Sequence, residues 1–171
     1  MKFWYSSDHH FHHRRIIEYC SRPFSSVQEM NQVMIERWNE VVKPDDIVYH
    51  CGDFCFGSLC AVHETVSQLN GYIFLVRGNH DRHWKRMESI GFAGVCDSLI
   101  VEDDGLFLGM NHRPRFDFNG KPCDIYLYGH VHNNEVPDAP PNAVNICVEM
   151  TDYRPVDLEW IKGKVYGSTI L

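Results

Sequence analysis

Five short apolar runs punctuate the chain, at residues 3–5, 47–49, 72–76, 106–108 and 125–128. They are rich in aromatic and β-branched residues, which is typical of buried strands. A polar group follows each run closely: Asp8-His9-His10, Gly52-Asp53, Gly78-Asn79-His80-Asp81, Asn111-His112 and Gly129-His130-Val131-His132. Ligands of α/β proteins bind beyond the carboxyl ends of strands. The five polar groups therefore predict a single site assembled from distant parts of the chain.

Three segments between the first runs have the pattern of helices. Residues 26–29 form a capping box, and apolar residues then recur at three- and four-residue spacing as far as Val41. This helix is expected to end near Pro44. Two further helices are expected at 59–69 and at about 82–90, the second ending at Gly91.

The pattern changes to short strands after Gly91. We expect strands at 94–98, 99–102, 106–110, 124–128 and 143–148, with a hairpin turn at 103–105. Near the C-terminal end we expect a short helix at about 156–161 and a strand from Val165. Strands and helices alternate in the first half, and strands dominate the second. This order predicts two packed sheets with helices outside them.

Size and charge limit the classes of function. The 171 residues are sufficient for one domain with its own core, and the formal net charge is −7. Duplex nucleic acid is therefore an unexpected partner, because binding it requires a basic surface. A small phosphate ester remains an expected substrate, since a metal site supplies its own positive charge. No apolar run is long enough to cross a membrane, so no membrane partner is expected.

The chain has seven cysteines, an odd number, and no apolar leader is evident before them. We therefore expect reduced thiols and a cytoplasmic location. The spacing of Cys51, Cys55 and Cys60 is a poor match to a zinc module. Cys51 precedes Gly52-Asp53 and is expected to form a buried wall of the site.

The polar groups provide a mixed set of candidate metal ligands: Asp8, His10, Asp53, Asn79, His112, His130 and His132. Oxygen and imidazole donors together suit transition metals better than they suit Ca²⁺ or Mg²⁺. We expect two divalent metal ions, with Mn²⁺ favoured and Fe, Zn²⁺, Ni²⁺ and Co²⁺ as alternatives. Among these donors a carboxylate bridges two cations most readily, and Asp53 is the natural bridge.

Two divalent ions held by only two carboxylates keep a net positive charge, which attracts phosphate and lowers the pKa of bound water. His80 is the candidate proton donor for the leaving group, with Asp81 placed to orient and charge it. The candidate substrate contacts are His13, Asn79 and His80. The histidines at 9, 12, 50 and 63 are expected to be core or surface residues.

Each motif alone would be weak, because Gly-Asp is common and Gly-Asn is a plain turn. Together they resemble the calcineurin-like metallophosphoesterase superfamily, whose pattern is D-x-H, G-D, G-N-H-D/E, a lone H and G-H-x-H. All five elements are present between residues 6 and 132. The segments 6–13, 44–49 and 153–156 are similar to the small, single-domain bacterial and phage phosphoesterases of this superfamily.

The resemblance implies a four-layer α/β/β/α sandwich of two mixed sheets flanked by helices, in one domain spanning 1–171 without a cap domain. One metal would be held by Asp8, His10, Asp53 and His132. The other would be held by Asp53, Asn79, His112 and His130. His80 would donate a proton or stabilise the transition state, with Asp81 as its partner.

The expected activity is metal-dependent hydrolysis of a phosphoric ester, in which a metal-bound hydroxide attacks phosphorus. Phosphodiesters are favoured over monoesters, because no clamp of basic residues for a dianionic phosphate is evident. The arginines at 82, 113, 115 and 154 are candidate contacts for phosphate or substrate, but the favoured interpretation of each is a surface charge. The alternatives are a phosphomonoesterase, acting on small molecules or phosphoproteins, and a binding module that has lost catalysis. Gaps in the motifs would favour the binding module, and the sequence has none.

Overall fold

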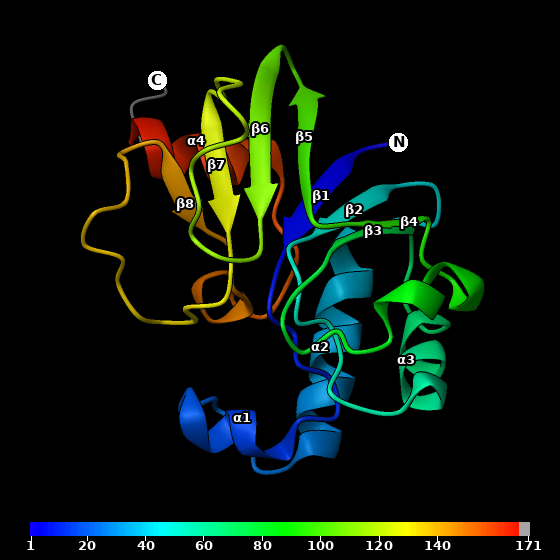
Figure 1. Ribbon diagram of the computed structural model, residues 1–171. Coiled ribbons are helices and arrows are strands. Elements are labelled where there is room, and N and C mark those ends of the chain that lie inside the picture. The colour runs from blue at the N-terminus through cyan, green and yellow to red at the C-terminus, as the bar shows by residue number, and fades with distance from the viewer. Residues whose placement is uncertain (168–171) are drawn as a thin grey trace.

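The computed structural model describes residues 1–167, which form two four-stranded sheets (Figure 1). The first sheet has the order β1 (Phe3–Ser6), β2 (Ile47–His50), β3 (Tyr72–Val76) and β4 (Gly94–Cys96). The second has the order β5 (Ser98–Asp103), β6 (Leu106–Asn111), β7 (Ile125–Tyr128) and β8 (Ala143–Asn145). The prediction of an α/β fold with two sheets is confirmed.

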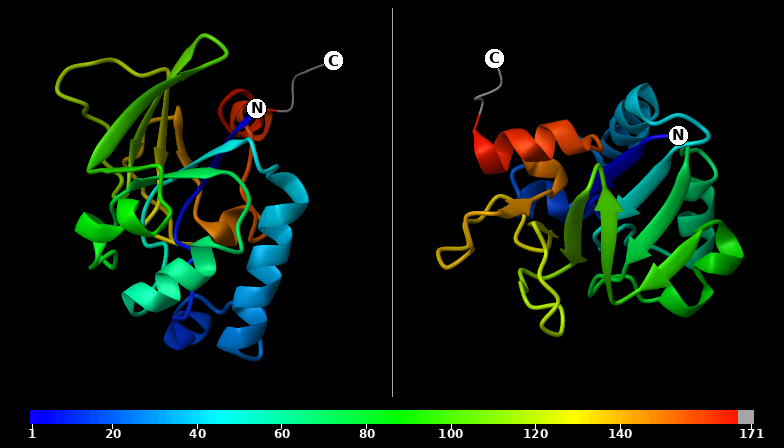
Figure 2. Two further views of the ribbon diagram at one scale, coloured as in Figure 1. Left: turned by 90° about the vertical axis from the view of Figure 1, so that its right-hand side faces the viewer. Right: turned by 90° about the horizontal axis from the view of Figure 1, so that it is seen from above.

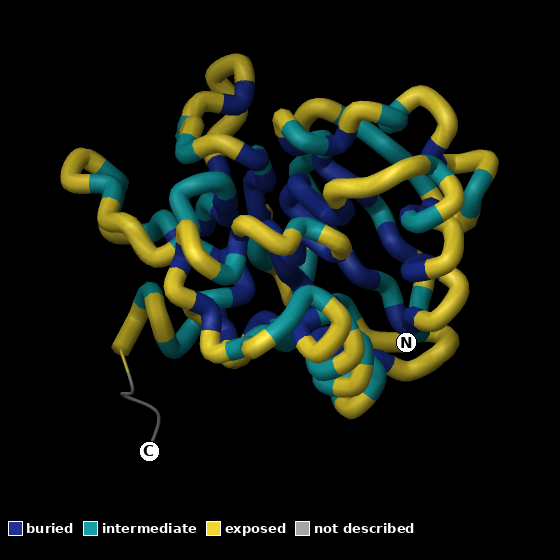
Figure 3. The backbone as a smooth tube through the Cα atoms, turned by 90° about the horizontal axis from the view of Figure 1, so that it is seen from below, coloured by how far each residue is buried: buried dark blue, intermediate teal, exposed yellow. Residues whose placement is uncertain are grey.

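The direction of the strands brings their ends together. All three pairings of the first sheet are parallel, so the expected mixed character is found among the strands of the second sheet alone. There, β5 and β6 form the predicted antiparallel hairpin, and β6, β7 and β8 are parallel. The strands β1, β6 and β7 finish on the same lower side of the molecule in Figure 1. Seen from that side, buried backbone occupies the centre and exposed turns surround it (Figure 3).

The observed helices agree in part with those predicted from the sequence. They are α1 (Arg14–Tyr19), α2 (Val27–Val41), α3 (Leu59–Val66) and α4 (Leu158–Tyr166), with short 3-10 helices at Trp84–Arg86, Glu88–Ile90 and Val148–Met150. The bounds of α2 are as predicted, and Ser26 Oγ accepts the cap hydrogen bond from Glu29 N–H. Helix α3 ends three residues before the expected Leu69. The short helix α1 was not predicted.

Two expectations were wrong. The segment 82–90 forms two 3-10 helices rather than one α-helix, because it buries Met87 alone and lacks the apolar stripe that stabilises a longer helix. The expected strand from Val165 is the last turn of α4. Asp157 caps this helix, and Leu158, Ile161 and Val165 share one helical face, which packs into the core. Residues 168–171 of the expected strand lie outside the described residues.

Helices α2 and α3 cover the outer face of the first sheet, and α1 lies beyond the strand ends (Figures 1 and 2). A second core fills the space between the sheets, with fully buried Tyr5, Val76, Leu108 and Ile125. Helix α4 flanks β8 and β1 and contributes Ile161 to that core. No helix within residues 1–167 combines the length and apolarity needed to span a membrane.

Asp46 fastens β1 to the turn before β2 and offers a test of the fold. Its buried carboxylate accepts hydrogen bonds from Lys2 N–H (2.7 Å), Trp4 Nε1–H (3.0 Å) and Lys43 N–H (3.0 Å). We expect Asp46→Ala to lower the free energy of unfolding by about 2 kcal/mol, because three donors lose their acceptor. Urea unfolding measures this loss. Asp45→Ala, at the exposed neighbour, is the control and should have little effect.

The same pair of proteins gives a pH test. Burial acts to raise the pKa of Asp46, but the hydrogen bonds from Lys43, Trp4 and Lys2 lower it further than burial raises it. A lowered pKa contributes stability above the unfolded pKa of about 3.9, and this contribution is lost as the pH falls through the folded pKa. The stability difference between wild type and Asp46→Ala should therefore shrink below about pH 4. A difference that grows in acid would contradict this role.

Candidate metal centre

The turns that carry the predicted metal ligands have an unusual backbone. Five of these residues adopt a left-handed conformation, with φ between 51° and 71°: Asp8, His10, Asp53, His130 and His132. Residues with a side chain seldom adopt this conformation, and they do so mainly where surrounding structure holds a functional site. Here Asp8 N–H donates to Gly52 O (2.9 Å), and His10 N–H donates to Asp53 O (3.0 Å). The turn after β1 is thereby fastened to the turn after β2.

Two glycines of the motifs make room for carboxylates. A side-chain carbon at Gly78 would overlap the carboxylate of Asp53, and one at Gly129 would overlap that of Asp8. The glycines of the Gly-Asn-His-Asp and Gly-His-Val-His motifs are therefore required by close packing against the acids of the site.

The two oxygens of the fully buried Asp8 have different surroundings. Oδ2 accepts three hydrogen bonds, from Ser7 Oγ, His130 N–H (2.8 Å) and Cys147 Sγ (3.3 Å). Within residues 1–167, Oδ1 has no hydrogen-bond partner, and neither has the buried Nε2 of His10. Oδ1 lies 3.7 Å from that nitrogen and 3.8 Å from Nε2 of His132. These donors converge and have free lone pairs, which fits a divalent cation. We call Asp8, His10 and His132 the first metal group.

The second metal group consists of Asp53, His112 and His130, whose candidate ligand atoms also lie close together. Nε2 of His112 lies 3.5 Å from Asp53 Oδ2 and 3.1 Å from Asn79 Oδ1. Its Nδ1 lies 2.8 Å from the carbonyl oxygen of Cys51. A hydrogen bond to a carbonyl fixes the tautomer that leaves Nε2 free for a metal. The expected position of Cys51 as a buried wall of the site is confirmed.

Asp53 connects the two groups. Its Oδ1 accepts the backbone N–H of His80 (2.8 Å), which fixes the carboxylate. Its Oδ2 lies 3.4 Å from Nε2 of His10, in the first group, and 3.5 Å from Nε2 of His112, in the second. One carboxylate oxygen therefore faces both sets of candidate ligands.

Neighbouring imidazoles keep both carboxylates ionised. Burial acts to raise the pKa of Asp8, but the nearby imidazoles of His10, His112 and His132 hold it well below its usual range. Burial also acts to raise the pKa of Asp53, but the neighbouring imidazole of His112 outweighs it, so this pKa is lowered as well. The site thus presents charged oxygens to a cation.

The sequence matches the model of the calcineurin-like phosphoesterase superfamily domain over residues 1–145. The chain belongs to this superfamily. The resemblance drawn from the five motifs is confirmed, and the protein is a metal-dependent phosphoesterase in its general class.

Two relatives and one solved structure resemble this phosphoesterase. The uncharacterized protein MJ1445 of Methanocaldococcus jannaschii is 36% identical over 176 residues, covering 96% of this chain and 94% of that protein. The gene 66 protein of Mycobacterium phage L5 is 33% identical over 81 residues, covering 46% of this chain and 39% of that protein. The crystal structure of AQ665 from Aquifex aeolicus, a protein of unknown function, has a TM-score of 0.77 and 27% identity, covering 94% of this chain and 97% of that chain.

A buried ion pair supports the first metal group of the phosphoesterase. Glu149 Oε1 lies 3.0 Å from Nδ1 of His132 and accepts hydrogen bonds from Arg22 Nη2 (2.7 Å) and Nε (2.9 Å). Arg22 also donates to the backbone carbonyls of Asp8 (2.7 Å) and His9 (2.8 Å). The pair therefore orients His132 and holds the turn that carries Asp8.

The charge around His132 favours a cation. Burial acts to lower the pKa of His132, but contacts with Cys20 and Glu149 and the charge of Asp8 raise it to about 10. Sequence reasoning missed Glu149 and Arg22. The available signal in the sequence was that each of these charged residues lies close to an otherwise apolar segment. Their spacing along the chain did not indicate that they form a pair.

The structure corrects the role expected for Asp81. Its buried carboxylate accepts hydrogen bonds from three backbone N–H groups, those of Asp53 (2.8 Å), Gly78 (2.8 Å) and Phe54 (3.0 Å). Burial raises its pKa to about 6, although these hydrogen bonds act against the rise. With both oxygens engaged by the backbone, Asp81 positions the turns that carry Asp53 and Asn79, rather than orienting and charging His80.

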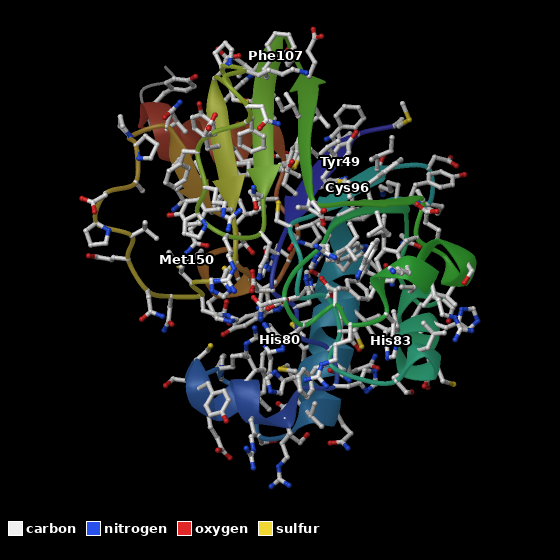
Figure 4. The ribbon with its side chains drawn as sticks, viewed as in Figure 1. Tyr49, His80, His83, Cys96, Phe107 and Met150 are labelled. Atoms are coloured by element: carbon white, nitrogen blue, oxygen red, sulfur yellow. The ribbon has the colours of Figure 1, made fainter. Side chains whose placement is uncertain are left out.

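His80 and His13 lie beside the ligands. The side chain of His80 is 35% exposed, and its Nε2 lies 4.0 Å from Asp53 Oδ2. Figure 4 shows His80 near the lower ends of the strands, opposite the end of the molecule that carries Phe107. Nδ1 of His13 lies 3.2 Å from Nδ1 of His10, and its ring stacks on Phe56 with centroids 4.2 Å apart.

The histidines without an expected role have structural contacts. Gly52 N–H donates to His50 Nδ1 (3.2 Å), so His50 Nε2 carries the hydrogen and donates to His9 Nδ1 (2.9 Å). Burial lowers the pKa of both imidazoles, that of His50 to about 3, which keeps this pair neutral. His12 Nε2 contacts Thr65 Oγ1 at 3.0 Å, and the exposed His63 contacts a backbone carbonyl.

Two clefts open beside the candidate metal ligands of the phosphoesterase. One, of about 710 Å³, extends from His80 and His132 to α1, with Tyr19 and Phe56 in its walls. The other, of about 620 Å³, contains Asn79, His112 and four arginines: Arg77, Arg82, Arg113 and Arg115. The last three are exposed as expected, but they gather at one cleft next to the ligands. Arg154 is paired with Asp152 (2.7 Å) outside both clefts.

We expect Glu149→Gln to weaken metal binding by Asp8, His10 and His132. Glutamine keeps the size of the side chain but removes the charge that supports His132, and loss of such a partner typically costs about 10–100-fold in affinity. Titration of metal-free protein with Mn²⁺ in competition with a chelating dye measures the change. Glu135→Gln, at an exposed position, is the control. Equal Mn²⁺ affinity in wild type and in a folded Glu149→Gln protein would contradict the role of this ion pair.

Proposed function

We propose that this protein is a dinuclear metal-dependent phosphodiesterase that cleaves small phosphate esters by direct attack of an activated water on phosphorus. The observation that carries the proposal is the position of Asp53 Oδ2, which lies 3.4 Å from Nε2 of His10 and 3.5 Å from Nε2 of His112. An oxygen between two sets of ligands suits a carboxylate that bridges two cations. Asp8, His10 and His132 would complete one site, and Asn79, His112 and His130 the other.

The donors support Mn²⁺ as the favoured metal, with Fe, Zn²⁺, Ni²⁺ and Co²⁺ as alternatives, because they combine carboxylate and amide oxygens with imidazoles. When bound, two such ions supply positive charge to the phosphate and lower the pKa of a water molecule. We also propose a cytoplasmic location, supported by seven cysteines that are all free thiols.

His80 is the proposed proton donor. Its backbone N–H is held by Asp53, while its partly exposed imidazole faces the cleft and the bridging carboxylate. In the proposed step the water loses a proton to solvent and its oxygen forms a bond to phosphorus. The bond from phosphorus to the leaving oxygen breaks, and His80 gives its proton to that oxygen. His13 and Asn79, at the edges of the two clefts, are proposed to contact the phosphate with His80.

The two clefts support a diester over a monoester. A diester has a substituent on each side of its phosphate, and here one cleft opens beside His80 and the other beside Asn79 and His112. The cleft beside His80 suits the leaving group, because the proton donor lies in it. The arginines of the other cleft are the observation that favours a monoesterase, since a dianionic phosphate binds well to guanidinium groups.

Hydrolysis of a matched pair of chromogenic esters tests the activity. We expect chelator-stripped protein to be inactive, and added Mn²⁺ to restore cleavage of bis-p-nitrophenyl phosphate with a higher kcat/KM than for p-nitrophenyl phosphate. A reversed ratio would make the protein a phosphomonoesterase. Two bound metal ions without hydrolysis of either ester would contradict the proposed activity on simple esters.

The role of His80 predicts a dependence on the leaving group. A good leaving group needs little protonation, so His80→Ala should reduce cleavage of a phenyl ester about 10²–10⁴-fold and that of the matched p-nitrophenyl ester less. Elemental analysis should find the metal content of wild type. His83→Ala, three residues along the same segment, is the control. Equal losses on both esters, or loss of metal, would show that His80 is not the proton donor.

A further inference from the structure

The arginine cleft, defined by Arg77, Arg82, Arg113 and Arg115, is continuous with the metal centre. Its walls also contain Asn79 and His112, whose side-chain oxygen and nitrogen lie 3.1 Å apart in the second metal group. A ligand at the metal centre can therefore extend into this cleft. Its volume of about 620 Å³ is in the range of sites for small molecules.

Three of the four arginines lack an acidic partner. Arg77 pairs with Asp97 (2.8 Å) and its guanidinium stacks on Trp84 at 4.6 Å from the ring centroid. Among residues 1–167, no carboxylate forms an ion pair with Arg82, Arg113 or Arg115. Among the same residues Arg14, Arg15 and Arg86 also lack an acidic partner. What distinguishes the cleft is that three such arginines gather beside candidate metal ligands, in a protein with a formal net charge of −7. Such a cluster suits a phosphate.

Hydrogen bonding links Arg113 to the second metal group. Arg113 Nη1 donates to His130 Nε2 (2.9 Å). A neutral imidazole has one nitrogen with a free lone pair, and ligation of a metal uses it. The other nitrogen then carries a hydrogen, which cannot bond to a guanidinium that only donates. Metal ligation by His130 and the hydrogen bond from Arg113 therefore exclude each other, and a metal-loaded protein has Arg113 available for an anion.

We propose that the substrate carries a second phosphate, or a group of similar charge, which Arg82, Arg113 and Arg115 hold while the reacting phosphate lies at the metal centre. The inference rests on the proposed function and narrows its substrate class to phosphate esters with at least two anionic groups. In this proposal the metal centre at the bridging carboxylate sets the position of the reacting phosphate. The arginine cleft recognises the anionic group attached to the rest of the substrate.

Binding of two matched nucleotides tests the proposal without turnover. Thymidine 3′,5′-bisphosphate and thymidine 5′-monophosphate differ by one phosphate, and calorimetry with Mn²⁺-loaded protein measures their affinities. We expect the bisphosphate to bind about tenfold or more tightly than the monophosphate. In Arg113→Gln/Arg115→Gln the ratio should fall to about one, with two metal ions retained. Arg86→Gln/Arg154→Gln removes the same charge outside the cleft and should keep the wild-type ratio.

Arg115→Gln alone gives the same test if the double variant loses metal. Among residues 1–167, Arg113 is the arginine of this cleft that hydrogen-bonds to a candidate metal ligand, and the side chain of Arg115 forms no such bond. Equal affinities for the two nucleotides in wild type, or a ratio unchanged by the cleft substitutions, would overturn the proposal. The p-nitrophenyl 5′-esters of the same two nucleotides separate it from the proposed function. Hydrolysis of both with equal KM would refute the second-phosphate site alone, whereas arginine-dependent binding without hydrolysis would refute the activity alone.

Discussion

The site depends on two buried carboxylates, those of Asp8 and Asp53, whose negative charge the surrounding structure must compensate. Their exposures are 0% and 2%. Burying an ionised carboxylate is costly unless hydrogen bonds and opposite charge compensate it. One oxygen of each acid is satisfied by the protein, through Ser7, His130 and Cys147 for Asp8 and through His80 N–H for Asp53. The remaining oxygens face imidazoles, and the proposed pair of cations would complete the compensation.

The fold supplies these conditions from distant segments. Parallel strands of both sheets finish on one side, so short turns of left-handed backbone can converge there. Gly78 and Gly129 leave space for the two carboxylates, and Asp81 ties the turn after β2 to the turn after β3. Arg22 donates a hydrogen bond to the backbone carbonyl of Asp8, and Glu149 contacts the imidazole of His132. The stability of these turns and the geometry of the metal site therefore depend on the same contacts.

Local patterns explain why much of this was predictable. The capped amphipathic segment of α2 and the apolar runs with polar ends are encoded over a few residues, and the order of the runs is sufficient to bring the ligands together. Contacts across long separations were not predictable. Arg22 and Glu149 are 127 residues apart, and their pairing depends on the packing of both turns. The role of Asp81 depends on which backbone amides surround its carboxylate. The arginine cleft depends on how the segments after β3 and β6 face each other.

The central claim is that Asp53 bridges two metal ions. Anomalous diffraction from crystals soaked in Mn²⁺, recorded on both sides of the manganese absorption edge, tests it most directly. We expect two peaks about 3.5–4 Å apart, with Asp53 contacting both. One should lie beside Asp8, His10 and His132, and the other beside Asn79, His112 and His130. A single peak, or a peak among Cys20, His132 and Glu149, would contradict it.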